Sequence, residues 1–506
     1  MSYGLTLCGL VLGLLLARAP TMRFAGAPLL ALPVAAAGAL LLAAAGALLP
    51  AIARLLGPRL LPVAGAAALF ALGALAGVIA ARERNLPRIK RGARLVGARR
   101  ARRGAFGERS TLCFAGQRVP HGDETKHFKL IGTTGTGKTT AIRGLIGSAL
   151  ARADRVIIAD PDGSYASRFY NRERGDRLLN PFDARSVGWD LQAELKQPQD
   201  GDQVARALIP DHAGEDRAWR GYARVFTAAT LRQLHRARKL NAGTLHRLLT
   251  AAPVEEVREL LAETAAAPFL SAENARFFAS VRAITTTYTA VLEHLECGAD
   301  RELLSVRDWV RASGAALPAA LFLTYRASQI ATLRNVVSTW MRLAIFEALE
   351  LPERDHRLWF VVDELDALGA IDGLKDALAR LRKFGGRCVL GFQSIAQVSG
   401  LYGTADAQTI IENCGNTLLL RCSASENGGT ARFASRLIGE REIIREQVTR
   451  SQHGAFDKPQ RSTTTSLQHV TESAVLPAEI EQLPDLTGYL KFASVPEWTL
   501  TTIPPD

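Results

Sequence analysis

The stretch GTTGTGKT at residues 132–139 matches the glycine-rich phosphate-binding loop GxxxxGK[ST] at every required position. A β-like apolar run at 128–132 precedes it and a helical pattern at 139–150 follows it, which is the strand–loop–helix setting that this loop needs. Its glycines let backbone N–H groups approach phosphate oxygens, and the following helix adds the partial positive charge of its N-terminus. The stretch therefore predicts an α/β domain that binds a nucleotide.

Residues of this loop and of the first helical turn are predicted to contact ATP. Lys138 is expected to reach the β- and γ-phosphates, and the Thr139 hydroxyl is expected to ligate Mg²⁺. The alternative is a glycine-rich left-handed turn without a ligand, which the strand–loop–helix setting disfavours. The predicted contacts are Gly132, Thr133, Thr134, Gly135, Thr136, Gly137, Lys138, Thr139 and Thr140.

An apolar strand that ends in two acids, LWFVVDE at 358–364, supplies the other half of the predicted site. Asp363 is expected to hold Mg²⁺ together with Thr139, and Glu364 to orient and polarise the attacking water. The alternative role, a strand-end cap, gives no reason for a second acid. The two motifs together predict an ATP hydrolase that uses ATP and Mg²⁺.

Two later polar residues are further candidates for catalysis. Gln393 ends the run RCVLGFQ at 387–393, where its amide could sense the γ-phosphate or the water, or could only make a strand-end hydrogen bond. Arg382 lies in ALARLRKFGGR at 377–387 and could act on the ATP of a neighbouring subunit as an arginine finger. From the residues alone, a solvated helix end explains Arg382 better.

The formal net charge of +13 is confined to the first 109 residues. Residues 1–81 carry +4 and residues 82–109 carry +9, so residues 110–506 are formally neutral. The positive charge is therefore no evidence for a basic DNA-binding domain. The 6 cysteines show no CxxC pair and no zinc-ligand spacing, which indicates ordinary reduced thiols in a cytoplasmic body.

Three apolar runs, at 3–17, 27–53 and 60–81, precede the neutral part of the chain. A bilayer-spanning helix needs about 20 apolar residues, so the second and third runs qualify and the first is marginal. Residues 1–81 are therefore predicted to form a membrane segment with two spans, or three, and the basic region 82–119 is predicted to lie in the cytoplasm. This region is expected to contact anionic lipid head groups, or to line the entrance of a channel for nucleic acid.

Short β-like runs alternate with helical ones from about residue 120, which predicts a mainly parallel sheet covered by helices. The alternation stops at 185–300, so we expect an all-helical insertion there. We assign 120–184 and 301–506 to one nucleotide-binding domain, and we expect an irregular excursion within it at 440–470. The predicted strands are 128–132, 156–160, 320–325, 359–363, 388–392 and 417–421.

The helical insertion contains a candidate basic surface. Between residues 217 and 247 there are eight Lys or Arg residues and no acid, with Trp219, Tyr222, His235 and His246 interleaved. Such a surface could contact DNA phosphates and stack on bases, and a solvated amphipathic helix pair explains it equally well. The candidate DNA-contacting residues are Arg217, Arg220, Arg224, Arg232, Arg236, Arg238 and Lys239.

Several segments, taken in their order along the chain, resemble the type IV secretion coupling proteins of bacterial conjugation, the TrwB/TraD-like members of the FtsK/HerA superfamily of P-loop ATPases. Besides the two motifs above, these segments are RVIIADPDGS at 155–164, LLNPFDARSVGWD at 178–190, GFQS at 391–394 and VLPAEIEQLPDLTGYL at 475–490. The resemblance covers nearly the whole chain. It implies a RecA-like nucleotide-binding domain with an all-alpha insertion and N-terminal transmembrane helices.

The resemblance also implies a function and three residue roles. The implied protein is a homo-hexamer in the bacterial inner membrane, multi-pass, with its body in the cytoplasm. It would pump single-stranded DNA, with double-stranded DNA as a further substrate, and would link the relaxase and relaxosome to the type IV secretion channel. In this family Gln393 would be the motif glutamine, Arg382 an arginine finger supplied in trans, and Asp160 an acid near the nucleotide.

Two rival hypotheses remain at this point. A chromosome-segregation translocase has a similar motor, but it usually carries more membrane spans and a winged-helix C-terminal domain, which we do not find in this sequence. An ATP-gated docking receptor would recruit its substrate without pumping. Replacing Glu364 separates a motor from a receptor, because only the motor needs hydrolysis.

Overall fold

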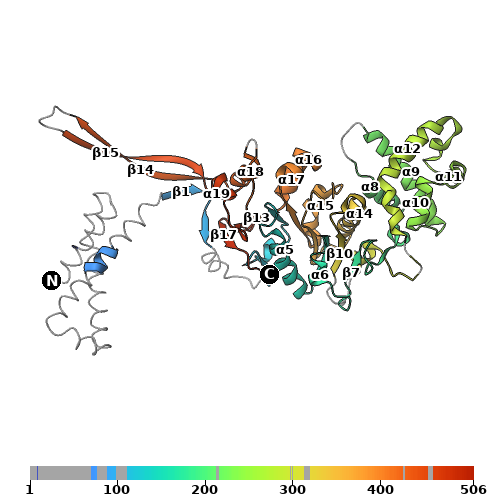
Figure 1. The fold of residues 1–506 in the computed structure, drawn as a ribbon, viewed down its shortest axis with the longest axis horizontal. Coiled ribbons are helices and arrows are strands. Elements are labelled where there is room, and N and C mark those ends of the chain that lie inside the picture. Colours follow the sequence, from blue (N-terminus) through green and yellow to red (C-terminus); the bar gives the residue numbers. More distant parts are fainter. Residues whose placement is uncertain are drawn as a thin grey trace. The chain divides into compact units, whose positions relative to one another are not determined.

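The computed structural model describes residues 8, 70–76, 88–97, 111–211, 216–296, 298, 300–312, 320–425, 428–453 and 460–505. The chain divides into two units, Met1–Gly92 with Arg441–Glu472 and Ala93–Glu440 with Ser473–Asp506. The larger unit contains every residue predicted to bind nucleotide or DNA, and its elements are labelled in Figure 1.

A ten-stranded sheet with the order β2-β17-β16-β13-β5-β12-β11-β6-β10-β7 forms the centre of the larger unit. From β13 to β7 the neighbouring strands are parallel, whereas β16 runs antiparallel to both β13 and β17. The strands are β2 Leu95–Gly97, β5 Phe128–Ile131, β6 Arg155–Pro161, β7 Arg177–Leu179, β10 Ala320–Tyr325, β11 Leu358–Val362, β12 Gly386–Phe392, β13 Asn416–Leu419, β16 Thr487–Lys491 and β17 Trp498–Thr502.

The central strands are apolar along their whole length because helices cover both faces of the sheet. Along β6, Val156 and Ile158 belong to one hydrophobic core, while Ile157 belongs to the core on the opposite face. The first core includes α5 (Lys138–Ala151), and the second includes α14 (Ile330–Ala348). All six predicted strands are present, so the prediction of an α/β fold with a mainly parallel sheet is confirmed.

Shorter helices complete the layers around the sheet. A small antiparallel pair, β3 (Cys113–Phe114) with β4 (Gln117–Arg118), lies next to α5. The remaining helices of the sheet domain are α6 Ala166–Phe169, α13 Val306–Arg311, α15 Leu374–Leu381, α16 Ile395–Tyr402, α17 Thr404–Asn413, α18 Gly429–Ile438 and α19 Pro477–Glu481, with the 3-10 helices η2 His121–Asp123 and η6 Arg382–Phe384. Together these elements leave the carboxyl ends of the parallel strands along one edge of the sheet.

The chain from 191 to 295 contains only helices and turns wherever it is described. In Figure 1 helices α9 to α12 gather at one end of the larger unit. Where the chain enters and leaves this part, β8 (Gly188–Trp189) pairs in parallel with β9 (Leu303–Leu304). The helices are α7 Leu191–Glu194, α8 Asp200–Leu208, α9 Arg217–Arg236, α10 Ala242–Thr250, α11 Val254–Leu261 and α12 Ala275–Thr289, with η3 Ala267–Leu270, η4 Ala272–Asn274 and η5 Ala290–Leu295.

A buried ion-pair cluster fastens the helical part to the sheet domain. Arg307 of α13 lies 2.7 Å from Asp200 Oδ1 on α8 and 3.5 Å from Glu347 Oε2 on α14. All three side chains are almost fully buried. Because the loss of one partner would leave a buried charge without compensation, this cluster fixes how the two parts meet.

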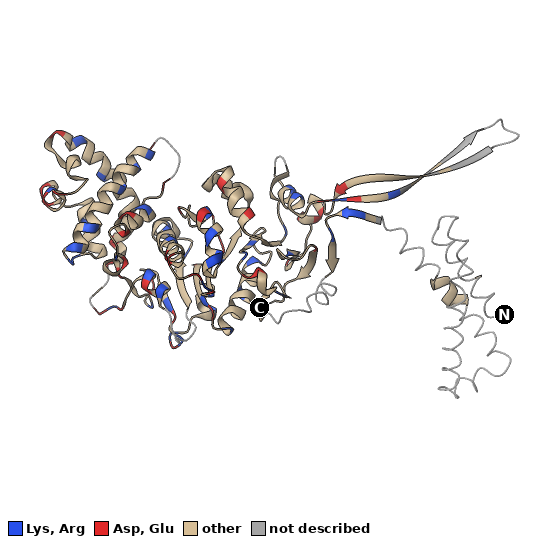
Figure 2. Cartoon of the chain, turned by 180° about the vertical axis from the view of Figure 1, so that it is seen from behind, with Lys and Arg blue, Asp and Glu red and all other residues tan. Residues whose placement is uncertain are grey.

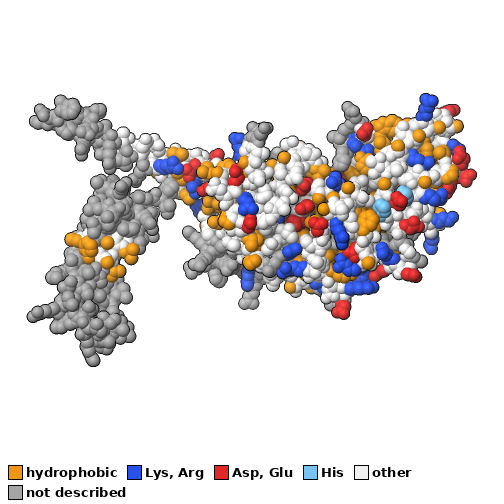
Figure 3. Space-filling model, viewed as in Figure 1, with side chains coloured by type: hydrophobic (Ala, Val, Ile, Leu, Met, Phe, Trp, Pro, Cys, Tyr) orange, Lys and Arg blue, Asp and Glu red, His pale blue; other side chains and the backbone are white. Residues whose placement is uncertain are grey.

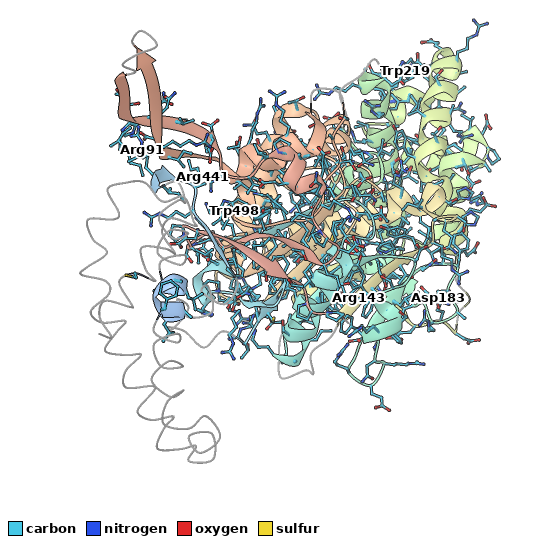
Figure 4. All side chains as sticks on the ribbon, turned by 60° about the vertical axis from the view of Figure 1, so that its left-hand side comes forward. Arg91, Arg143, Asp183, Trp219, Arg441 and Trp498 are labelled. Atoms are coloured by element: carbon cyan, nitrogen blue, oxygen red, sulfur yellow. The ribbon has the colours of Figure 1, made fainter. Side chains whose placement is uncertain are left out.

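The smaller unit contains a long β-hairpin where we expected an irregular excursion. Strands β14 (Glu440–His453) and β15 (Gln460–Ser473) pair with each other, and β1 (Arg88–Gly92) pairs with β14. The expectation for 440–470 was therefore wrong. In this unit Lys90 and Arg91 of the basic region both contact Glu442, as does His469. The hydrogen bonds with His469, Arg91 and Lys90 lower the pKa of Glu442 to about 2. Figure 4 labels Arg91 on β1 and Arg441 on β14.

The predicted membrane spans are not tested by these elements. Among the described residues, no helix combines the length and the apolar character that a bilayer crossing requires. The predicted spans at 3–17, 27–53 and 60–81 lie outside the described residues, apart from Cys8 and residues 70–76. The membrane segment therefore stays a prediction from the sequence.

Candidate nucleotide-binding and catalytic site

Residues 132–137 form the turn between β5 and α5, as the loop motif predicts. Gly135 and Gly137 have φ values of 77° and 109°, in a region that residues with a side chain rarely adopt. A Cβ on Gly132 would lie 2.8 Å from the Cβ of Leu420, so any side chain at this position would clash and only glycine fits. The loop can therefore keep its backbone N–H groups open to an anion at the start of α5.

The ammonium group of Lys138 is held against the loop. Its Nζ donates hydrogen bonds to the carbonyl oxygens of Gly132, at 2.6 Å, and Thr133, at 3.1 Å. Burial lowers the pKa of Lys138, while the negative charges of Asp363 and Glu364 oppose this effect. Lys138 is thus placed to donate to phosphate groups that lie on the loop.

The other threonines of the loop have different surroundings. Thr133 donates from its N–H and its hydroxyl to the carbonyl oxygen of Arg421, at 2.9 and 3.3 Å. Thr136 is buried, Thr134 is exposed at the tip of the loop, and Thr140 is half-buried in the first turn of α5. The exposed tip is the part of the loop that a phosphate can reach from solvent.

The carboxylate of Asp363 stands at the end of β11 and fits a metal site. Thr139 Oγ1 donates to its Oδ2 at 2.7 Å, while its buried Oδ1 has no hydrogen-bond partner among the described residues. A hydrated Mg²⁺ would satisfy such an oxygen. A Cβ on Gly391 of β12 would lie 2.2 Å from the backbone oxygen of Asp363, so only glycine lets the two strand ends meet here.

Glu364 has surroundings that suit a general base. Burial raises its pKa, and the negative charges of Asp363 and Asp366 raise it further. At the end of β10, the negative charge of Glu364 adds to burial in raising the pKa of Tyr325. The buried hydroxyl of Tyr325 has no partner in the described part of the chain. A carboxylate with a raised pKa beside a hydroxyl can hold a water for proton transfer.

The carboxylate of Asp160 faces the backbone of its own segment. Oδ1 accepts from the N–H of Tyr165 at 3.0 Å, and Oδ2 accepts from the N–H of Ala166 at 2.7 Å. Burial raises the pKa of Asp160 to about 6 in spite of these bonds. Sequence reasoning missed Tyr165, whose buried hydroxyl donates to Asp363 Oδ2 at 2.7 Å.

Gln393 and Arg382 lie at opposite edges of the sheet. Gln393 directly follows β12, between the carboxyl ends of β5 and β11, so it shares the edge that carries the loop and Asp363. Arg382 is exposed in η6, before the amino end of β12. The 7 residues of β12 at about 3.3 Å each hold Arg382 roughly 23 Å from that edge. Arg382 therefore cannot reach the nucleotide site of its own chain.

The amino edge of the sheet carries a buried network of ion pairs. Glu124 lies 2.7 Å from Arg152 and 3.1 Å from Arg387, and Arg387 also contacts Asp355 at 2.7 Å. These contacts lower the pKa of Glu124 although its burial opposes them. The network joins the segments that lead into β5, β6, β11 and β12.

A buried histidine at the same edge makes two hydrogen bonds with the backbone. His127 Nε2 lies 2.8 Å from the carbonyl oxygen of Leu378, and its Nδ1 accepts from the N–H of Cys388 at 3.0 Å. The neutral ring with its proton on Nε2 satisfies both partners, whereas a proton on Nδ1 would face another donor. Burial lowers the pKa of His127 to about 4.

The C-terminal segment supports the loop from one side, which sequence reasoning did not foresee. The N–H of Leu486 donates to the carbonyl oxygen of Thr136 at 3.0 Å. A Cβ on Gly137 would lie 2.8 Å from Leu486 Cδ2. Arg421, whose carbonyl oxygen binds Thr133, forms an ion pair with Asp485 at 2.7 Å. The segment at 483–486 is therefore part of the nucleotide site.

The candidate DNA-contacting residues do not share one environment. Arg217 lies 3.1 Å and Arg224 3.4 Å from Asp211, and Arg232 lies 2.8 Å from Asp202. Figure 2 shows basic and acidic residues interspersed along these helices, and the space-filling view in Figure 3 shows their side chains mixed over the visible face of this part. Arg220 is buried, and Arg217 is exposed at the start of α9, where it contacts Asp211. The remaining candidates are exposed at the end of α9 and in the turn after it: Arg236, Arg238 and Lys239.

The aromatic residues of α9 pack mainly on their own domain. Trp219 and Tyr222 have their ring centroids 5.4 and 5.1 Å from that of Phe277. Tyr222 is 39% exposed and Trp219 is half-buried. Figure 4 shows Trp219 well separated from Arg143, which lies on α5 beside the nucleotide site. Any contact of α9 with DNA is therefore distinct from the nucleotide site.

Comparison with known proteins identifies the family. Residues 111–502 match the family described as type IV secretion-system coupling protein DNA-binding domain. The chain is 32% identical to the coupling protein TraD of Escherichia coli K12 over 371 residues, which is 72% of this chain and 51% of TraD. It is 26% identical to VirD4 of Agrobacterium fabrum over 130 residues, covering 24% of this chain and 19% of VirD4. The chain thus spans about half the length of TraD.

Solved structures agree with this assignment. The unbound conjugative coupling protein TrwBdeltaN70 superposes with a TM-score of 0.73 at 29% identity, covering 82% of this chain and 94% of that one. TrwB in complex with the ATP analogue ADPNP gives a TM-score of 0.72 at 29% identity, with 83% and 95% covered. The phosphate-binding loop, the acidic strand end and every strand of the central sheet except β2 lie within the matched region 111–502, and the chain belongs to the type IV secretion-system coupling protein family.

Proposed function

We propose that the chain is an ATP hydrolase that moves DNA as the coupling protein of a conjugative type IV secretion system. The single observation that carries its nucleotide chemistry is the Thr139–Asp363 hydrogen bond at 2.7 Å, next to a carboxylate oxygen without a partner among the described residues. TrwB, a protein of similar fold, has been solved with ADPNP and with ADP and Mg²⁺, which supports ATP and Mg²⁺ as the ligands.

Each side chain of the site would have a separate task. Lys138 and the loop N–H groups would bind the phosphates, and Thr139 with Asp363 would hold Mg²⁺. The bound Mg²⁺ would offset the negative charge of the phosphates. Glu364, with its raised pKa, would orient the attacking water and accept its proton, and Gln393 would sense the γ-phosphate from the neighbouring strand.

A homo-hexamer is part of the proposal because an arginine finger at Arg382 would have to reach the nucleotide site of another chain. Arg382 is exposed at the amino edge of the sheet, far from the loop of its own chain. In a ring, the amino edge of one subunit can face the carboxyl edge of the next. Arg382 would then stabilise the negative charge of the transition state in trans.

The proposed location is the bacterial inner membrane, with the larger unit in the cytoplasm. The apolar runs within residues 1–81 and the basic residues at 82–109 support a multi-pass anchor of two or three spans. Partners would be the relaxase with its relaxosome and the components of the secretion channel. Single-stranded DNA would be the main substrate, and double-stranded DNA would also bind through its phosphates.

DNA-stimulated ATP hydrolysis by the full-length chain tests this function. Single-stranded DNA should raise the rate of hydrolysis, and the stimulation should fall as salt is raised. The test variant replaces three exposed residues together by alanine: Arg236, Arg238 and Lys239. The slope of log K for DNA binding against log salt concentration should become less steep by about two. The matched control replaces Arg217, Arg224 and Arg232, which already have acidic partners. Hydrolysis that never responds to DNA would contradict the proposal.

A further inference from the structure

The metal-binding carboxylate of the site is held by two hydroxyl groups, and only one of them belongs to the loop motif. Thr139 Oγ1 and the hydroxyl of Tyr165 both donate to Asp363 Oδ2, each at 2.7 Å. The other oxygen of the same carboxylate, Oδ1, has no hydrogen-bond partner within the part of the chain that the structure describes. Because both hydroxyl groups bind Oδ2, Oδ1 is the oxygen of Asp363 that stays available for a ligand.

The position of Tyr165 is itself tightly determined. Its side chain is fully buried, and the guanidinium of Arg143 on α5 lies 5.9 Å from its ring centroid. The carboxylate of Asp160 accepts hydrogen bonds from the N–H groups of Tyr165 and Ala166, which fixes the turn into α6. Asp160 therefore acts on the metal site indirectly, because it holds the turn that positions Tyr165.

We infer that Tyr165 is a positioning residue for the magnesium–nucleotide site, and this inference rests on the proposed ATP–Mg²⁺ function. Its hydroxyl, by binding Oδ2, would keep Asp363 in the rotamer that leaves Oδ1 available to hold the metal. A tyrosine that only filled the core would need no hydroxyl, because phenylalanine has nearly the same shape. Hydrogen-bond partners of metal ligands typically change metal affinity by about 10–100-fold when removed.

The test is the Mg²⁺ dependence of nucleotide binding, measured on the full-length chain with Glu364→Gln so that ATP persists. A fluorescent ATP analogue is titrated in EDTA and then at increasing Mg²⁺ concentration. Adding Tyr165→Phe should change the dissociation constant of the analogue in EDTA by no more than about twofold. It should raise about tenfold the Mg²⁺ concentration at which half of the Mg²⁺-dependent increase in affinity is reached. Saturating Mg²⁺ should restore the tight binding.

Two further variants complete the experiment. Tyr170→Phe, which removes the hydroxyl of a half-buried tyrosine five residues further on, should leave both curves unchanged. Asp160→Asn should raise the Mg²⁺ requirement in the same direction as Tyr165→Phe, because it loosens the turn that carries Tyr165. It also keeps the inference testable if Tyr165→Phe does not fold.

Three results would overturn the inference. The first is an unchanged Mg²⁺ requirement in Tyr165→Phe. The second is that Tyr165→Phe weakens binding of the analogue equally with and without Mg²⁺, which would show that Tyr165 has only a packing role. In the third, the Glu364→Gln chain itself does not bind the analogue, and this result would contradict the proposed ATPase function as well. The Glu364→Gln control therefore separates failure of the inference from failure of the proposed function.

Discussion

The two edges of the central sheet differ in how their buried polar groups are paired. At the amino edge, Glu124 is shared between Arg152 and Arg387 at 2.7 and 3.1 Å. At the carboxyl edge, one carboxylate oxygen of Asp363 and the hydroxyl of Tyr325 are buried without a partner in the described part of the chain. Arg387 keeps ion pairs through both of its terminal nitrogens, and only its Nε is buried without a partner in the described part of the chain. Because the buried charges of the amino edge are paired with opposite charges, this edge serves stability, whereas the carboxyl edge keeps groups available for a ligand.

Arg382 is the exception at the amino edge, and its replacement should have the largest effect. Arg382→Ala should lower ATP hydrolysis by about 10³–10⁵-fold, since an arginine finger contributes that much. The melting temperature of the Arg382→Ala variant should equal that of the natural chain, because the Arg382 side chain is exposed.

Mixing provides the control for this prediction. Lys138→Ala subunits lack the phosphate-binding ammonium but keep Arg382, so mixed rings should recover part of the activity. If mixtures of the two inactive variants stay inactive, Arg382 does not act on the site of a neighbouring subunit. Unchanged hydrolysis by Arg382→Ala alone would show that Arg382 is only a solvated helix end.

Breaking the amino-edge network should affect stability and not chemistry. Glu124→Ala leaves the buried Arg387 without one of its partners, and such a loss destabilises by about 3–5 kcal/mol. Chemical unfolding of the full-length chain measures this change. Asp355→Ala, at a half-exposed partner of Arg387, is the matched control and should cost less than about 1 kcal/mol. Equal losses from both variants would argue against a network centred on Glu124.

Acid should weaken the amino edge through His127. Its pKa is about 4 in the folded chain and 6.5 in the unfolded chain, so its contribution is complete above pH 6.5 and is lost as the pH falls toward 4. The loss is at most about 3 kcal/mol. His127→Gln should reduce the drop in unfolding free energy between pH 7 and pH 4 by that amount, measured by chemical unfolding at both pH values. An unchanged drop would contradict this role of His127.

At the carboxyl edge, a substitution should abolish ATP hydrolysis and leave the stability of the fold intact. Asp363→Asn keeps an acceptor for Thr139 and Tyr165 but removes a negative charge beside Glu364. The free energy of unfolding should therefore stay the same or rise by about 1 kcal/mol, while Mg²⁺-dependent hydrolysis is lost. Parallel unfolding and activity measurements check this, and a large loss of stability would contradict the division between the two edges.

The elements that were predictable are those whose sequence carries a hydrophobic period or a phosphate-loop signature. The six predicted strands are buried on both faces and read as continuous apolar runs. The hairpin of β14 and β15 was missed because the segments REQVTR at 445–450 and QRSTTTS at 460–466 have no apolar alternation to reveal a strand. The Thr-rich composition favours β-structure, but this signal is weak without a buried face.

The parts of the site that could not be predicted depend on contacts between distant residues. The hydroxyl of Tyr165 meets Asp363 across 198 residues, and no spacing in the chain reports such a contact. The acids that neutralise the basic helix, Asp202 and Asp211, precede the window 217–247 in which the charge was counted. The loop residues were predictable because their geometry is local, whereas their supports come from the rest of the fold.

The frequency of DNA transfer with Glu364→Gln tests the proposed function most directly. The variant chain replaces the natural one in donor cells, at equal abundance in the membrane, and it should still bind ATP. If the chain is a motor, transfer should fall to the level seen with Lys138→Ala, because hydrolysis is needed for every step. Transfer near the normal level, with hydrolysis abolished, would contradict the motor and support an ATP-gated docking receptor.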